Sequence, residues 1–452
     1  MLNERSLLSQ FLHFTAATVA SLMVFSLYSI VDGLFVAKGV GKYAMSAVNL
    51  AVPFTNVLFS IAVIFAVGSS TIIAIYLGQG KKEKANSPFS QNLVLLTVFG
   101  LFIGALVFMF PEPFAKLLGA KDITLPYTID YLKGLAPFSV FFIISYNLEV
   151  LIKTDGYPKL AILTVITGCL ANCVLDYTAI FLLDRGIFGA AVATGLSQML
   201  TSVIYMHHFL RGKTTFHPVR FRMEWSIYRR LIPIGIADGM TELCNGLMIF
   251  LFNRVILFCL GQDGLVSYTI IAYVNTLVIN TMMGISQGSQ PLISFHYGSS
   301  DRAGYRKLLR YGFTAIAALT GIIFAAAMVF APQIVGIFLG NENPEINFAS
   351  IQALRMYAVS YLTVGFNILM GGFLTAVERP KGAICISAGR GLIFQAAALG
   401  LLAFLAGGRA IWLTPTVSEA VCLVMAVFFL RRFLRADEFQ RESFSAVETN
   451  PE

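Results

Sequence analysis

Charge is scarce in this 452-residue chain. Only 12% of its residues are Asp, Glu, Lys or Arg, whereas a soluble domain carries roughly 25%. Hydrophobic residues make up 57% of the chain. A single soluble core stops growing at about 250–300 residues, so a chain this long and this apolar needs lipid as a second solvent. The composition excludes an ordinary soluble protein and predicts a membrane protein.

Motifs for chemistry are also missing. The sequence has no GxxxxGK[ST] phosphate loop, no HExxH and no GxSxG, so nothing indicates an ATP motor, a zinc hydrolase or a serine nucleophile. The six cysteines lie in apolar runs without CxxC spacing, and the five histidines are scattered toward span ends and loops. We therefore expect a protein that is not an enzyme, uses no ATP and holds no cofactor.

Long apolar runs are what the chain does have. A spanning helix needs about 20 mostly apolar residues, and twelve segments meet that length. They lie near 11–37, 48–77, 91–111, 129–152, 160–183, 187–210, 231–260, 266–296, 311–331, 349–376, 383–405 and 410–433. The sequence thus predicts an all-α polytopic membrane protein with six spans in each half.

The two halves repeat each other. Glycines and prolines recur at offsets of 220 to 222 residues. The clearest pairs are Pro111 with Pro332, Gly68 with Gly288, and Pro158 with Pro380. Because six spans bring each half into the membrane from the same side, we expect two six-helix lobes related by a pseudo-two-fold axis along the membrane normal. A duplicated apolar chain is typical of a secondary transporter, with its substrate path between the repeats.

Basic residues predict the orientation. With the N-terminus inside, 22 Lys and Arg fall in cytoplasmic segments and 8 in outside segments, which favours both termini in the cytoplasm of an inner-membrane protein. The net charge of +8 then reflects topology, and no nucleic-acid partner is expected. The expected units are a first lobe at 1–210, a basic cytoplasmic linker at 211–230, a second lobe at 231–435, and a polar tail at 436–452 that we expect to be disordered.

Acids inside the first lobe are the strongest candidates for function. An ionisable group at bilayer depth costs at least about 2.5–3.5 kcal/mol, so it usually marks an ion path. Asp32 lies late in the first span with Tyr28 one turn earlier, and Asp176 lies in the fifth span with Asn172 one turn earlier. Thr194 adds a hydroxyl in the sixth span. These oxygens suit Na⁺, and carboxyl groups in a buried setting equally suit a proton; the alternative is that both acids reach interfacial water.

The second lobe carries a different set. Asp238 and Glu242 are four residues apart and share a helix face in the seventh span. They suit a cation-attracting wall of a substrate cavity, although the first turn of a helix also favours acids. We add Gln287 and Glu149 as candidates for the same cavity. Glu419 and Arg390 are positioned to pair across the last two spans, either for function or for structure.

The chain resembles the multidrug and toxic compound extrusion (MATE) family over nearly its whole length. The stretches that carry the resemblance are Val31-Asp32-Gly-Leu-Phe-Val36, Asp155-Gly-Tyr-Pro-Lys159, Asn172-Cys-Val-Leu-Asp176, Gly186 to Thr194, and Gly284 to Ser294. The last of these, from Gln287, together with Ile411-Trp412 and Glu419, looks most like the bacterial MepA-like branch.

The resemblance implies two lobes in a V around a central cavity, and cation-driven export of amphipathic, often cationic, drugs or toxic metabolites by alternating access, of the kind that confers antibiotic resistance. By similarity, Asp32, Asn172, Asp176 and Thr194 match the cation cluster, with Tyr28 as its hydrogen-bonding neighbour. The implied partners are small organic cations, H⁺ or Na⁺ and membrane lipid, and a monomer is expected. Span ten has no Asp and span one no proline, so neither a second-lobe cation site of the NorM type nor a proline-bent first helix carries over.

Two other functions remain open from the sequence. A lipid-linked oligosaccharide flippase of the same superfamily would line its cavity with several Arg for pyrophosphate, whereas only Arg254 and Arg390 lie within spans here. A channel or sensor without coupled transport fits a full-length duplication with acids in one lobe less well than alternating access does.

Overall fold

The computed structural model describes residues 6–212, 214–339, 344–405 and 407–448, and every regular element in these ranges is helical. The first half contains α1 (Leu7–Gly39), α2 (Lys42–Gly78), α3 (Lys82–Met109), α4 (Pro111–Leu117), α5 (Thr124–Leu135), η1 (Ala136–Phe138), α6 (Ser139–Thr154), α7 (Pro158–Tyr177), η2 (Thr178–Leu182) and α8 (Gly186–Leu210). The second half contains α9 (Trp225–Gly298), α10 (Arg302–Leu339), α11 (Pro344–Ala358), α12 (Tyr361–Ala376), α13 (Pro380–Ala388), η3 (Gly389–Ile393), α14 (Phe394–Leu405), η4 (Gly408–Leu413) and α15 (Thr414–Glu448).

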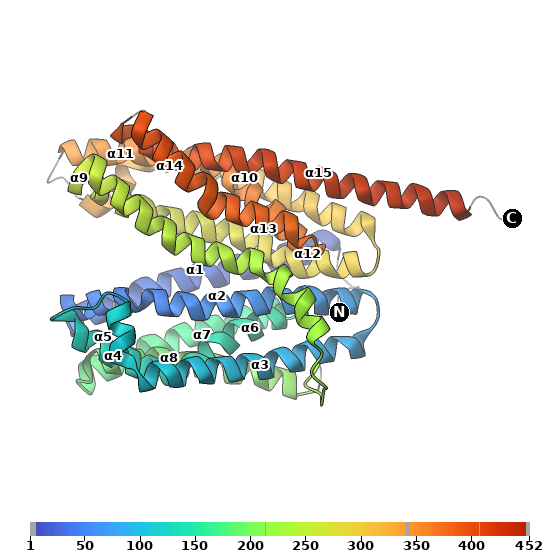
Figure 1. Ribbon diagram of the computed structural model, residues 1–452, viewed down its shortest axis with the longest axis horizontal. Helices are drawn as coiled ribbons and strands as arrows, with labels where there is room; N and C mark the ends of the chain where they lie inside the picture. Colours follow the sequence, from blue (N-terminus) through green and yellow to red (C-terminus); the bar gives the residue numbers. More distant parts are fainter. Residues whose placement is uncertain (1–5, 213, 340–343, 406, 449–452) are drawn as a thin grey trace.

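The 74 residues of α9 are two spans joined by a sharp reversal. Gly261 has φ 68° and ψ −159°, a backbone conformation outside the helical region that glycine tolerates best. Phe252 and Tyr268 stack with ring centroids 5.4 Å apart, although 16 residues of straight helix would separate them by roughly 24 Å. The chain therefore turns back at Gly261, as the green-to-yellow ribbon of Figure 1 shows.

The span count follows from this reversal. Within the described residues, ten helical segments are long and apolar enough to cross a membrane, and α11 with α12, bent by 40°, makes an eleventh. Counting α9 as two spans gives twelve, six in each half. The chain is thus an all-α, multi-pass membrane protein, as the hydrophobic pattern predicts.

The twelve spans form two lobes that lie side by side with their long axes roughly parallel (Figure 1). α1 to α8 build one lobe, and α9 to α15 build the other. Two large clusters of buried apolar side chains are centred on different lobes, one on α2, α5 and α8 and the other on α9, α10 and α12. The second cluster also takes in Phe11 and Phe14 of α1. Each lobe therefore has a core, and the core of the second lobe extends across the interface to α1.

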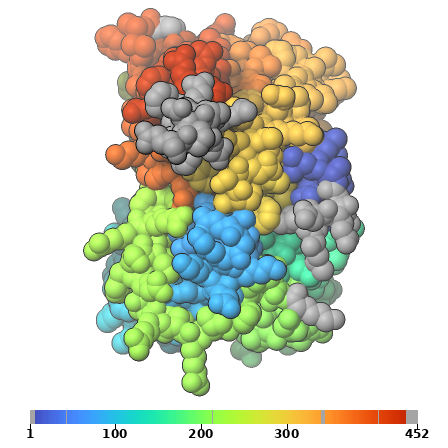
Figure 2. Space-filling view, turned by 90° about the vertical axis from the view of Figure 1, so that its right-hand side faces the viewer, coloured from blue at the N-terminus to red at the C-terminus, as the bar shows by residue number. Residues whose placement is uncertain are grey.

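Close helix packing joins the lobes at one end, the end that holds both termini and the segment 211–224 (Figure 1). A Cβ on Gly235 of α9 would overlap the backbone of Ile64 in α2, and a Cβ on Gly78 of α2 would overlap the backbone of Phe295 in α9. Figure 2 views this end face on, with residues near 80 directly against residues near 300. Small residues permit this approach of two backbones.

Toward the opposite end the contacts between the lobes become sparser. About halfway along α1, Asn280 Nδ2 of α9 donates a 2.7 Å hydrogen bond to Ser26 Oγ. Beyond it, apolar side chains of α1 such as Leu27 and Leu34 are 58% and 51% exposed. On α9, Leu247 is 47% exposed. The packing thus closes the molecule at the terminal end only.

Hydrogen bonds hold the linker between the lobes against α3. The backbone N–H groups of His217, Val219 and Glu224 donate to side chains of α3, namely Asn86 Oδ1, Ser90 Oγ and Gln91 Oε1, each at 2.9 Å. α8 ends at Leu210 and α9 begins at Trp225. The polar residues at the start of α3 therefore satisfy the backbone of an otherwise irregular segment.

The expectation of a disordered tail from residue 436 is wrong for its first part. α15 continues to Glu448, because the buried Asp437 accepts from Tyr305 Oη at 2.7 Å and pairs with Arg306 at 2.9 Å. Two partners on α10 thus fix the helix beyond the apolar span. Residues 449–452 lie outside the described residues.

Candidate functional site

Three helices of the first lobe bring the predicted ion-binding residues together. Asp32 comes from α1, Asn172 and Asp176 from α7, and Thr194 from α8. Asn172 and Asp176 are fully buried, and Thr194 is 7% exposed. Asn172 and Asp176 are four residues apart and so face the same side of α7, which points toward α1 and α8.

The Asn172 amide links two of these helices. Oriented with its nitrogen toward Asp176, it donates to Asp176 Oδ2 at 2.7 Å, and its oxygen accepts from the Thr194 backbone N–H at 3.3 Å. The Thr194 hydroxyl donates to Ala190 O at 3.0 Å, which directs its lone pairs toward the cluster. The Asn172 amide, held by the Thr194 backbone, thus positions the carboxyl group of Asp176.

The two carboxyl groups lie within hydrogen-bonding reach of each other. Oδ1 of Asp32 and Oδ1 of Asp176 are buried and have no hydrogen-bond partner among the described residues. Unpartnered buried oxygens are costly, and each of these two atoms can accept a hydrogen bond or ligate a small cation. Oxygen ligands of this kind suit Na⁺.

The sequence does not predict two features near the cluster. Tyr131 of α5 is only 6% exposed and lies close enough to both acids to interact electrostatically, as does the predicted neighbour Tyr28. Directly after Asp176 and Tyr177, the chain forms a π-helical turn, η2. Such turns are rare and often occur at functional sites. Neither has a sequence signal, since a lone Tyr in an apolar run is common and π-turns have no motif.

The residues predicted for a substrate cavity surround Tyr146 of α6. Asp238 and Glu242 of α9 interact electrostatically with this tyrosine, as does Glu149 of α6, and Gln287 of α9 is within hydrogen-bonding reach of it. The tyrosine belongs to the first lobe and three of the four neighbours to the second. The structure therefore gathers all four candidates at the interface between the lobes, near the inner limit of the close packing.

Their charges are not equivalent. Glu149 Oε1 pairs with Lys153 Nζ at 2.7 Å on the same helix, and the two side chains are 15% and 9% exposed. Asp238 Oδ2 is buried and lacks a hydrogen-bond partner in the described part of the chain. Glu149 is thus paired with a lysine of its own helix, whereas the neighbours of Asp238 are the uncharged Thr375 and Gln290.

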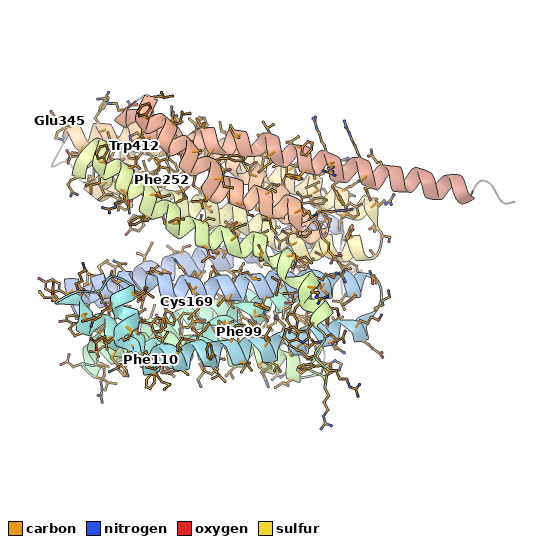
Figure 3. The ribbon with its side chains drawn as sticks, viewed as in Figure 1. Phe99, Phe110, Cys169, Phe252, Glu345 and Trp412 are labelled. Carbon is orange, nitrogen blue, oxygen red and sulfur yellow. The ribbon has the colours of Figure 1, made fainter. Side chains whose placement is uncertain are left out.

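The predicted pair of Arg390 and Glu419 forms in the second lobe. Arg390 Nη2 of η3 lies 3.3 Å from Glu419 Oε1 of α15, and the side chains are 10% and 4% exposed. Asn367 Nδ2 of α12 donates to Glu419 Oε2 at 2.7 Å. Figure 3 places Phe252 and Trp412 in this lobe and Phe99, Phe110 and Cys169 in the other.

Comparison with known proteins agrees with this architecture. A MepA multidrug export protein of Staphylococcus haemolyticus is 24% identical over 440 residues, covering 96% of both chains, and one of Staphylococcus aureus is 22% identical over 432 residues, covering 94% of both. An outward-facing multidrug resistance MATE transporter superposes with a TM-score of 0.89 at 21% identity, covering 95% of this chain and 96% of its own.

A transporter of Pyrococcus furiosus, described as having a binding pocket of reverse polarity, superposes with a TM-score of 0.88 at 22% identity, covering 95% and 96% of the two chains. At these identities the structures establish the fold. The MatE family model matches residues 17–178 and 240–396, one stretch in each lobe and together well over half of the chain. The protein therefore belongs to the MatE family.

Proposed function

We propose that this protein is a cation-coupled antiporter that exports amphipathic, often cationic, organic compounds from the cell. The observation that carries the proposal is the buried pair of Asp32 and Asp176, each with an unpartnered oxygen. The multidrug export names of its full-length relatives support the substrate class. The coupling ion is H⁺ or Na⁺, because the same oxygens suit both.

The coupling follows from where the ion-binding residues lie. Asp32 is on α1, the helix that also packs through Phe14, Thr15 and Val19 against α9 of the second lobe. An ion between Asp32 and Asp176 ties α1 to α7, while its loss leaves two like charges that push the helices apart. The ion therefore binds the two arrangements of α1 with different affinity, which is what a coupled conformational change requires.

The substrate binds between the lobes in this proposal. Asp238 and Glu242 supply negative charge for an organic cation, and the aromatic ring of Tyr146 beside them supplies a cation–π surface. Residues of both lobes meet there, so a bound molecule contacts both and senses their relative position. The observations do not favour a flippase, because Arg390 of the second lobe is already paired with Glu419.

Efflux of ethidium from cells that express the chain tests the proposal. The variants are Asp32→Asn and, as a matched control, Asp130→Asn, which removes an exposed carboxyl group of α5. We expect export by the parent and the control, and loss of at least tenfold in Asp32→Asn at equal protein level. Collapsing the Na⁺ and pH gradients separately should abolish export in one case and so identify the ion. Normal export by Asp32→Asn would refute the assignment.

A further inference from the structure

The second lobe has a polar centre that the proposed coupling site does not include. A cavity of about 50 Å³ opens beside Arg390 and Glu419. Its other polar lining residues are Asn245, Asn275, Tyr357, Ser360 and Gln395. At bilayer depth, a buried charged pair beside a polar cavity is costly and needs an explanation.

The internal repeat relates this centre to the ion-binding lobe. The 222-residue offset between Pro158 and Pro380 maps Thr194 of α8 onto Thr416 of α15. The same offset maps α7 onto the segment formed by α13, η3 and the start of α14, which contains Arg390. The two polar centres therefore lie between corresponding helices of the two lobes.

A second correspondence joins the helices on the other side of the centre. In the first lobe, Ser145 Oγ of α6 donates to Gln198 Oε1 of α8 at 2.7 Å. In the second lobe, Asn367 of α12 donates to Glu419 of α15 at the same distance. Donor and acceptor are 52 residues apart in the second lobe and 53 residues apart in the first. The link between the helices is kept, and in the second lobe its acceptor is a carboxylate one helix position earlier, because the offset maps Gln198 onto Ala420.

The charges then differ in one respect. The first-lobe centre has two acids and no basic residue among the side chains described above. In the second-lobe centre, Arg390 pairs with Glu419. Glu242 is also close enough to Arg390 to interact with it electrostatically. The guanidinium thus interacts with two acids. The offset maps Arg390 onto Gly168, where a Cβ would already overlap Thr201. A helix contact in one lobe is thus replaced by a cation in the other.

We infer that Glu419, held in place by Asn367, forms a second cation-binding site whose resident cation is the Arg390 guanidinium, so that this lobe takes up no free ion. Arg390 Nε is buried and lacks a hydrogen-bond partner among the residues described, so the side chain borders the cavity with one donor unbound. Without Arg390, the buried Glu419 carboxylate requires another cation, because an uncompensated buried charge is strongly unfavourable.

Fluorescence of Trp412 provides a direct readout. The chain has two tryptophans; Trp225 is 64% exposed, whereas Trp412 is 5% exposed and lies seven residues before Glu419. In a Trp225→Phe parent, Trp412 is the sole reporter. The groups facing Glu419 or its partner are Arg390, Asn367, Tyr357, Cys422 and Glu242.

The experiment compares four purified proteins in that parent: unchanged, Arg390→Lys, Arg390→Met, and Arg390→Met with Glu419→Gln. Each is titrated with Na⁺ at fixed pH and with pH at fixed Na⁺. The first lobe is unchanged in all four proteins, so its fluorescence response is the same in each and can be subtracted. We expect Arg390→Met to gain a saturable change in one titration, and the other three to lack it.

With folded proteins, three outcomes would overturn the inference. They are an equal response in the unchanged or Arg390→Lys protein, a response that persists in the double variant, and no added response from folded Arg390→Met. Folding is checked by a single symmetric elution peak. Should Arg390→Met fail to fold, rescue by the added Glu419→Gln supports the inference, and failure of that double variant contradicts it. The readout needs no transport, so its failure is distinct from failure of the proposed antiport.

Discussion

The two acids of the first lobe lie together as a pair, although they are far apart in the sequence. Asp32 and Asp176 lie 144 positions apart in sequence, and the structure brings them within hydrogen-bonding reach. The sequence identifies both residues as candidates for function, because an acid in an apolar run is costly and conspicuous. The contribution of Tyr131 could not be predicted, since a Tyr near a span start has an ordinary role at the membrane interface.

The amide of Asn172 tests how the acids are positioned. Replacing it with Ala in Asn172→Ala removes the 2.7 Å donor to Asp176 Oδ2. Loss of a group that orients an ion ligand typically weakens binding about 10–100-fold, so the ion concentration for half-maximal transport should rise by that order while transport persists. Thr167→Ala on the same helix is the control, because its hydroxyl bonds only its own backbone, at Leu163 O. Equal ion dependence in both variants would contradict the role of Asn172.

At the scale of elements, hydrophobic length predicts the spans well and their interruptions poorly. The reversal at Gly261 follows from the need to cross the membrane twice. The π-turns η2 and η3 and the bend between α11 and α12 do not, because no residue pattern specifies them. The sequence also does not predict the helical tail, since its order depends on the contacts of Asp437 with Arg302, Arg306 and Tyr305 of α10.

Backbone contact between α2 and α9 makes Gly235 a sensitive position. In Gly235→Ala the new Cβ meets the Ile64 backbone, which cannot rotate away. Overpacking of this kind costs about 1–3 kcal/mol, so the thermal midpoint in detergent should fall. Gly321→Ala of α10 is the matched control, with open space around its Cβ and a helix propensity gain of up to about 1 kcal/mol. Equal midpoints for both variants would show that the lobes do not pack as described.

Asp155, between α6 and α7, is expected to make folding stability depend on pH. Burial raises the pKa of this carboxyl group, although its contacts with His208 Nε2 at 2.9 Å and Thr215 N–H at 2.7 Å oppose the shift. The folded protein thus holds the proton more tightly than the unfolded chain, whose Asp titrates near about 3.9. This stabilisation is present below about pH 4 and is lost as pH rises through the folded value.

Asp155→Asn stays neutral and removes that dependence, while keeping an acceptor for Thr215 and a donor for His208. We expect the thermal midpoint of the parent, relative to this variant, to fall as pH rises from about 4 to 8. The measurement is thermal unfolding of both purified proteins across that range. A constant difference, or one that changes in the opposite direction, would show that Asp155 is not the group responsible.

At the scale of the whole molecule, the duplication explains the symmetry of the two lobes and, in this account, the separate role of each lobe. Two six-helix lobes could be predicted from the repeat and the even number of spans. That the lobes pack closely at the terminal end could not, because it depends on backbone contacts such as Gly78 with Phe295. In this account the first lobe binds the coupling ion, the interface binds the substrate, and the second lobe carries its own cation.

Transport by the purified protein in liposomes tests this division most directly. Ethidium movement is measured with an imposed Na⁺ gradient, an imposed pH gradient, or neither. The account predicts that one gradient drives ethidium against its own gradient in the parent and in Asp130→Asn, and that neither does so in Asp32→Asn. Uphill movement by Asp32→Asn, or parent transport that ignores both gradients, would contradict coupling through the first lobe.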